Sequence, residues 1–198
     1  MENKNVISKG VKYSIVTIIL VIIAVIGCSF FLYANKPQVI QQETLEGGSI
    51  TLTYSDDENL FVMENGVPTS DSVGMIFDSA DKYFDFTVKT VVDEADYIEY
   101  QIILEKDNDV STALDSNVKV YLEREDSGTF VKVGEPIKFA TEVSENDEDV
   151  SLSIFKVKKT SNDTDNYRLR MWIDETATID ANQIQNYGVK VAIKGEAK

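Results

Sequence analysis

Apolar and polar residues alternate along one short segment after another from Ile50 to the end of the chain. In residues 50–54, Ile50, Leu52 and Tyr54 alternate with threonines. A period of two places alternate side chains on opposite faces of a β-strand, whereas an amphipathic helix needs an apolar stripe at a period of 3.6. No stretch of ten residues in this part carries a convincing helical stripe. The pattern therefore predicts a chain of half-buried antiparallel strands.

The same alternation predicts strands at several further places. The longer ones are expected at residues 83–90, 97–104, 117–125, 150–159, 167–174 and 187–195, and the shorter ones at residues 60–63, 73–77, 129–133 and 137–140. Within the strand at 150–159 the apolar phase shifts from Ile154 to Phe155, which predicts a β-bulge. Asp126, Ser127 and Gly128 form a hairpin signal between two alternating runs. One short helical turn is expected within residues 178–184.

This number and spacing of strands predicts the fold class. Eight to eleven short strands in one domain, residues 49–198, are typical of an all-β, antiparallel β-sandwich of either jelly-roll or immunoglobulin-like type. The sequence does not choose between the two types.

An uncharged apolar run precedes this domain. Residues 15–33 carry no charge, and these 19 residues would span about 28 Å as a helix, close to the hydrocarbon thickness of a bilayer. Lys4, Lys9 and Lys12 lie before the run, so the positive-inside rule places residues 1–12 in the cytoplasm. Residues 13–34 are predicted to form one transmembrane helix, with the C-terminal domain outside the cell.

Three interpretations of this segment stay open. The first is an uncleaved signal anchor, favoured because the run exceeds the usual length of a signal-peptide core. The second is a signal peptide cleaved near Ala34, which would release a secreted protein. The third is lipidation of Cys28, since residues 25–28 (VIGC) resemble a bacterial lipobox. The alternative to lipidation is that Cys28 is an ordinary small residue that faces the membrane, and we prefer this alternative.

Residues 35–48 are polar and contain Pro37, Gly47 and Gly48. This composition is typical of a linker between bilayer and domain. The alternative is an edge strand, which could be donated to the sheet of a neighbouring subunit.

Charge and composition exclude several functions. After the apolar run the chain carries 16 Lys and Arg against 33 Asp and Glu, a net charge of −17. Such a surface repels nucleic acids, so no nucleic-acid partner is expected. The chain has no histidine and one cysteine, and no catalytic motif is present. We therefore expect a protein that is not an enzyme.

Clustered acids on loops are the only chemically suggestive feature. Asp147 and Asp149 lie before one expected strand, and Asp163 and Asp165 lie before another. Carboxylates on loops suit Ca²⁺, so these four residues are candidate calcium ligands, and calcium is the one cofactor considered. The alternative, which we favour, is solvated turns in an acidic surface protein.

Arg168, Arg170 and Trp172 occupy alternate positions of one expected strand. Such a stripe could stack on sugars or anchor a partner, which makes these residues candidate interaction residues. The alternative, again favoured, is that a loop covers Trp172 and that the arginines pair with nearby acids.

The order of motifs along the chain resembles a known group of proteins. The apolar segment is followed by ITLTYSDDENL, a Pro-Thr-Ser-Asp stretch at residues 68–71, FDFTVKT, NVKVYLERE and YRLRMWID. This order resembles camelysin and TasA-type secreted or membrane-anchored β-sandwich proteins of Gram-positive bacteria, which form biofilm matrix. The resemblance implies a jelly-roll fold and assembly into fibres in which an N-terminal segment, here residues 36–49, completes the sheet of the next subunit.

Together these features predict a cell-surface or extracellular-matrix protein with a structural or adhesive role. It would display an acidic β-sandwich on the cell membrane and associate with itself through β-strand addition. The alternative function is that of a glycan- or small-ligand-binding accessory ectodomain.

Overall fold

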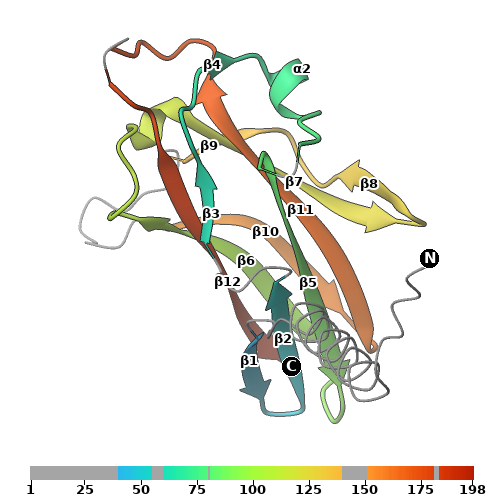
Figure 1. Cartoon of the computed structure of the whole chain (residues 1–198). Coiled ribbons are helices and arrows are strands. Elements are labelled where there is room, and N and C mark those ends of the chain that lie inside the picture. The colour runs from blue at the N-terminus through green and yellow to red at the C-terminus, as the bar shows by residue number, and fades with distance from the viewer. Residues whose placement is uncertain (1–39, 55–59, 80, 140–150, 181–182) are drawn as a thin grey trace, which may run out of the picture. The chain divides into compact units, whose positions relative to one another are not determined.

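The computed structural model describes residues 40–54, 60–79, 81–139, 151–180 and 183–198 (Figure 1). Within them the chain forms one compact unit, which belongs to the range Gln38–Lys198. The apolar run with Cys28, and the acids Asp147 and Asp149, lie outside the described residues. Among the residues that are described, no helix has the length and apolar character needed to cross a membrane.

Strands account for most of the described residues. They are β1 (Ile40–Leu45), β2 (Gly48–Tyr54), β3 (Leu60–Met63), β4 (Pro68–Thr69), β5 (Tyr83–Val92), β6 (Ile98–Asp107), β7 (Val118–Asp126), β8 (Thr129–Lys132), β9 (Ile137–Lys138), β10 (Ser151–Lys159), β11 (Asp163–Asp174) and β12 (Tyr187–Ala197). Two short helical turns, α2 (Asp71–Gly74) and the 3₁₀ turn η1 (Asp115–Asn117), join them.

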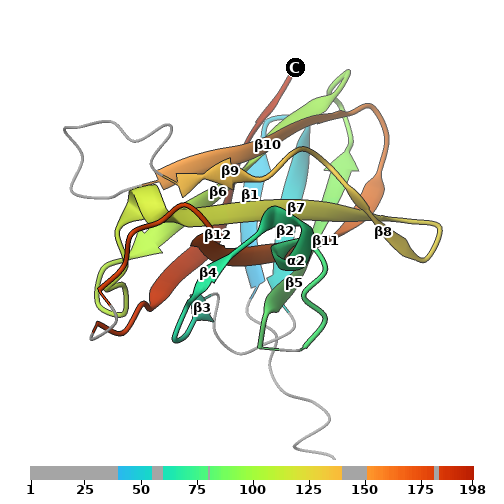
Figure 2. The same cartoon turned by 90° about the horizontal axis from the view of Figure 1, so that it is seen from above.

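The strands form two sheets (Figures 1 and 2). The eight-stranded sheet has the order β1-β2-β5-β11-β7-β8, with β4 and β9 added to β11 and β7, and the four-stranded sheet has the order β10-β6-β12-β3. Neighbouring strands are antiparallel, except that β4 runs parallel to β11. The predicted all-β, antiparallel class is therefore confirmed.

Both sheets contribute side chains to one hydrophobic core. Tyr54 on β2 donates a hydrogen bond to the carbonyl oxygen of Val191 on β12, at 2.7 Å. The rings of Phe155 on β10 and Tyr167 on β11 lie 6.1 Å apart in an edge-on arrangement. Phe61 on β3 packs on Phe84 of β5. These contacts pair the inner faces of the two sheets, an arrangement that fits a β-sandwich.

Two local predictions are confirmed. The register of β10 against β6 shifts between Ser153 and Phe155, where the change of apolar phase predicted a bulge. β7 and β8 form a hairpin whose two central residues, Ser127 and Gly128, have φ of 53° and 84°. Positive φ at both positions is the signature of a type I′ turn, which matches the twist of the joined strands.

The strand predicted at residues 73–77 is wrong. The chain turns there instead, because Gly74 N and Met75 N donate hydrogen bonds to the carbonyl oxygens of Ser70 and Asp71. The apolar residues Val73 and Ile76 remain exposed, so their spacing did not reflect a buried strand face. The helical turn predicted within residues 178–184 stays a prediction, because residues 181 and 182 lie outside the described residues. Among the described ones, Gln183 N donates a hydrogen bond to Asp180 O.

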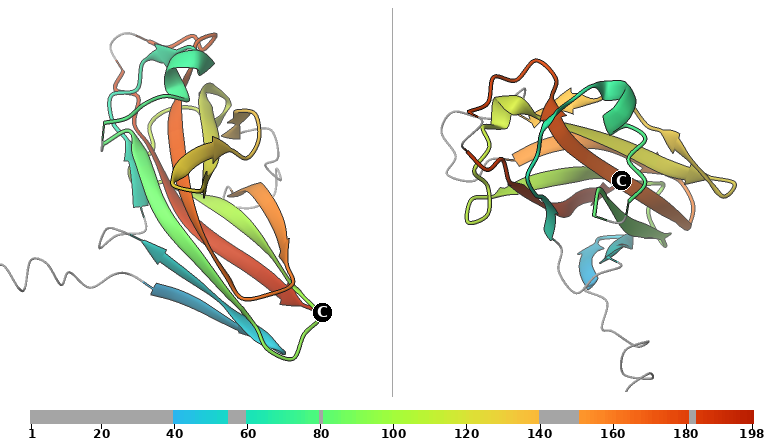
Figure 3. Two further views of the ribbon diagram at one scale, coloured as in Figure 1. Left: turned by 90° about the vertical axis from the view of Figure 1, so that its right-hand side faces the viewer. Right: turned by 45° about the horizontal axis from the view of Figure 1, so that its top comes forward.

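Part of the segment that precedes the expected domain is also a strand. All six residues of β1 pair with β2 through a tight turn in which Gly47 has a φ of 92°. The turn between β1 and β2 and the C-terminus lie toward one end of the described unit, and α2 lies at the other (Figures 1 and 3). Of the two interpretations of residues 35–48, the edge strand therefore applies to residues 40–45.

Candidate functional site

Arg168, Arg170 and Trp172 lie on the outer face of β11, as the alternation predicted. The residues that alternate with them along β11 are buried in the core; they are Tyr167, Leu169, Met171 and Ile173. The outer face is not uniformly exposed, however, because every residue from Leu169 to Asp174 is buried. The stripe is therefore not an open interaction surface along its whole length.

Trp172 is covered rather than exposed. Its side chain retains 1% of its accessible surface and lies against Gly74 of α2 and the ring of Tyr121, whose centroid is 6.5 Å away. β4 pairs with the end of β11 and α2 follows directly, so the segment that follows β3 crosses over this side chain. Trp172 cannot stack on a ligand in this state, in agreement with the structural alternative.

Arg170 is also held inside the protein. Its Nε donates a hydrogen bond of 2.7 Å to the carbonyl oxygen of Phe77, and its Nη1 forms an ion pair with Glu123 on β7. Burial lowers the pKa of the guanidinium below its ordinary value. The contact with Phe77 fastens the segment after α2 to the outer face of the eight-stranded sheet, and the contact with Glu123 joins β11 to its neighbour β7.

Arg168 is the member of the stripe that stays accessible. Its Nε and Nη2 donate to the two oxygens of Asp85, each at 2.7 Å, and this bidentate pair raises the pKa of the guanidinium. The guanidinium carbon lies 3.9 Å from the ring centre of Tyr83 and 4.2 Å from that of Phe130. A fork–fork pair and two ring faces fix Arg168 in one geometry.

Asp163 and Asp165 come together but are already paired with a cation. Lys159 Nζ lies 2.6 Å from an oxygen of each carboxylate, and Tyr100 donates to Asp165 at 2.9 Å. The hydrogen bond from Lys159 lowers the pKa of Asp163. Within the described ranges, no group of three or more acidic, histidine or cysteine side chains could hold a metal ion. Calcium at this pair would have to displace Lys159.

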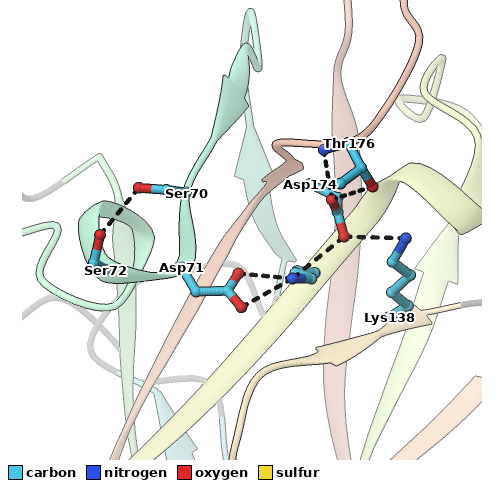
Figure 4. A network of polar contacts seen from close by, with 7 residues as sticks. Ser70, Asp71, Ser72, Lys138, Asp174 and Thr176 are labelled. Atoms are coloured by element: carbon cyan, nitrogen blue, oxygen red, sulfur yellow. Dashed lines mark hydrogen bonds and ion pairs between the residues drawn. The ribbon is translucent and has the colours of Figure 1, made fainter.

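A polar network that sequence reasoning missed surrounds Asp174 at the end of β11 (Figure 4). One carboxylate oxygen accepts hydrogen bonds from Thr176 N and Oγ1, at 2.7 and 2.6 Å. The other lies 3.3 Å from Lys119 Nζ and 3.0 Å from Lys138 Nζ, and Lys119 in turn pairs with Asp71 of α2. The sequence offers no signal for this network, because its members are far apart in the chain.

The four strands that end the sheet orders differ in how they are protected against pairing with another chain. β10 carries Lys156, Lys158 and Lys159 together with its bulge, and β3 and β8 are four residues long. Lysines, bulges and short length are the usual protections of edge strands. The six residues of β1, IQQETL, include no lysine, proline or bulge.

β1 is nevertheless held in place within its own subunit. Glu43 Oε2 accepts a hydrogen bond of 3.0 Å from Gly195 N on β12 of the other sheet. The neighbouring side chains of Gln42 and Thr44 are exposed. β1 is thus a regular edge strand whose six residues include no lysine, proline or bulge, although they include the charged residue Glu43, and we take it as the candidate functional site for self-association.

A scan against known protein families finds no family that matches this chain, and a search of curated proteins likewise finds no match.

Proposed function

We propose that this protein is a cell-surface or extracellular-matrix structural or adhesive protein whose copies associate by strand addition at β1. The observation that carries the proposal is that β1 ends the order of its sheet and includes no lysine, proline or bulge. Alternate residues of an edge strand direct N–H and C=O groups away from the sheet, and a strand from a second copy can satisfy them. The resemblance to camelysin and TasA-type matrix proteins supports the proposal, because it too implies assembly by strand addition.

Within this proposal the fold is a β-sandwich of the jelly-roll type. In an immunoglobulin-like sandwich several consecutive strands pair within one sheet. Here the successive long strands alternate between the two sheets, once the short strands β8 and β9 are left aside. In chain order they are β5, β6, β7, β10, β11 and β12. This alternation favours the jelly-roll type.

We also propose that residues 13–34 anchor the protein in the cell membrane with the acidic domain outside. The support is the uncharged run of 19 residues with three lysines before it. The net charge of −17 after the run keeps such a domain soluble and away from anionic headgroups.

Self-association is tested with the full chain in mild detergent, by sedimentation velocity and electron microscopy. The wild type should form dimers or fibres at micromolar concentration. A double variant, Gln42→Lys with Thr44→Lys, places two lysines on β1 and should remain monomeric, because paired strands would bring these charges together. Thr129→Lys is the matched control, since Thr129 is equally exposed on the short strand β8.

Two results would contradict the strand-addition proposal. One is a wild type that stays monomeric at all concentrations. The other is assembly that persists unchanged in the double variant.

The membrane anchor is tested by intact mass and N-terminal sequence of the natively expressed protein in membrane and medium. The anchor proposal predicts the full-length chain in the membrane fraction. A start near Ala34 in the medium would replace the anchor with a cleaved signal peptide. A start at Cys28 with added lipid mass would replace it with a lipoprotein.

A further inference from the structure

A row of four polar side chains and one aromatic side chain crosses five strands on the outer face of the eight-stranded sheet. Thr53 on β2 is opposite Thr87 on β5, which is opposite Asn166 on β11. The row continues through Glu125 on β7 to Phe130 on β8, which pair with each other. Because side chains directly opposite each other in a sheet are close neighbours, these residues form one continuous strip.

Hydrogen bonds fix the centre of this strip. Thr87 Oγ1 donates to Asn166 Oδ1 at 2.8 Å, and Asn166 Nδ2 donates to Glu125 Oε2 at 2.7 Å. An amide has two N–H groups and a carboxylate has two oxygens, so Asn166 and Glu125 each keep capacity for a further partner. The side chain of Asn166 is exposed. The strip thus presents oriented donors and acceptors to a ligand.

The aromatic side chain of Phe130 lies at one end of the strip. The guanidinium of Arg168 lies over the ring of Phe130 and is paired with Asp85. The strip, which includes Phe130, lines a cavity of about 280 Å³ together with Asp85, Phe86 and Tyr167. This volume is just below the range of small-molecule sites, roughly 300–1,000 Å³.

We propose that this cavity binds a neutral saccharide, one or two rings at a time. A sugar ring offers hydroxyl groups that both donate and accept, which match the mixed amide, hydroxyl and carboxylate groups of Thr87, Asn166 and Glu125. Its C–H face is apolar and can lie on an aromatic side chain, which Phe130 supplies. A sugar ring could therefore bind the polar side chains through its hydroxyl groups and Phe130 through its C–H face.

The charges of the cavity argue against anionic ligands. Asp85 and Glu125 lie in its lining, and Arg168 has its cation neutralised by Asp85. The chain after the apolar run is also strongly acidic. A phosphate or sulfate group would meet unfavourable charge on approach, whereas a neutral polyol would not. The proposal does not rest on strand addition at β1, although β1 pairs with β2, which carries Thr53 of the strip.

The test is calorimetric titration of the full chain with short oligosaccharides of glucose, mannose, galactose and N-acetylglucosamine. At least one should bind with a dissociation constant below about 10 mM. Asn166→Ala should weaken that binding about tenfold, since it removes hydrogen bonds at the centre of the strip. Phe130→Ala should weaken it by a similar factor.

A matched control separates this site from the rest of the protein. Gln101→Ala on the outer face of the other sheet should leave binding unchanged. Thr87→Val, which keeps side-chain shape, guards against a variant that fails to fold, and circular dichroism checks each one. The proposal is overturned if none of the four sugars binds, if Asn166→Ala and Thr87→Val both bind as the wild type does, or if a sulfated oligosaccharide binds more tightly than its neutral counterpart.

Discussion

Asp174 is the buried charge on which most contacts converge. It retains 2% of its accessible surface, yet two lysines and Thr176 surround it. Hydrogen bonds from Thr176, with smaller contributions from Lys138 and Lys119, hold the pKa of Asp174 well below its usual range. An ionised buried carboxylate is stable only with such partners. This residue therefore links β11 to β7, β9 and, through Lys119, α2.

Asp174→Asn should destabilise the fold by about 2–4 kcal/mol at pH 7, because it leaves two lysines without their shared partner. Urea denaturation measures the loss. Glu135→Gln, which breaks the exposed pair with Lys132, is the control and should change stability by less than about 1 kcal/mol.

The contribution of Asp174 also has a defined pH dependence. A carboxylate with a lowered pKa in the folded state stabilises the protein above its unfolded pKa of about 4 and loses that contribution as the pH falls further. The difference between wild type and Asp174→Asn should therefore be full at pH 7 and shrink below about pH 4. A difference that grows on acidification would contradict this account.

Three buried tyrosines should resist ionisation at high pH. Burial is the largest cause that raises the pKa of Tyr100, Tyr167 and Tyr187 above the ordinary value for tyrosine. A raised pKa means that their contribution to stability is complete below pH about 10 and is lost as the pH rises beyond it. Ultraviolet titration at pH 11 should show these tyrosines still neutral while the protein remains folded, and ionised once urea unfolds it. Their ionisation in the folded protein would refute the prediction.

The packing of α2 on β11 depends on one glycine. A Cβ atom built on Gly74 would collide with the indole ring of Trp172, which is buried and has little room to move. Gly74→Ala should therefore displace α2 and cost about 1–3 kcal/mol. Trp172 is the only tryptophan of the chain, so its fluorescence reports the change directly as a shift to longer wavelength. Gly134→Ala is the control, since its Cβ would meet open space.

The strands could be predicted because burial follows the alternation of residue types. β5, for example, alternates buried and half-exposed residues from Tyr83 to Val88 as its sequence does. The covering of Trp172 could not be predicted, because alternation shows which side chains share a face but not what crosses over that face. The strand predicted at residues 73–77 fails for a related reason: Val73 and Ile76 are exposed, and it is Gly74 that lies against Trp172. β1 shows little apolar alternation, so its sequence does not distinguish a linker from an edge strand.

The candidate sites show a similar division. The sequence placed Arg168, Arg170 and Trp172 on one face correctly, yet only tertiary contacts reveal that Arg168 alone remains accessible. The saccharide cavity combines Thr53, Thr87, Asn166, Glu125 and Phe130 from five strands. Strand order brings these residues together, and local sequence patterns carry no information on that order.

The net charge of the whole protein sets the conditions for its assembly. Copies that each carry −17 after the apolar run repel one another at low ionic strength. Salt shortens the range of this repulsion to about 10 Å at 0.1 M. Association should therefore strengthen as sodium chloride is raised from about 0.01 to 0.5 M, measured by sedimentation velocity. Association that weakens with salt would mean that attraction between opposite charges joins the copies, rather than backbone pairing at β1.

Amide hydrogen exchange of residues 40–45 tests the central claim most directly. The full chain is compared at concentrations where it is monomeric and where it is associated, with the lysine double variant of β1 as the reference. If copies join at β1, the amides that face away from β2 gain hydrogen-bond partners, and exchange in this peptide should slow on association in the wild type alone. Unchanged exchange at residues 40–45, with slower exchange at β8 or β10 instead, would contradict the account.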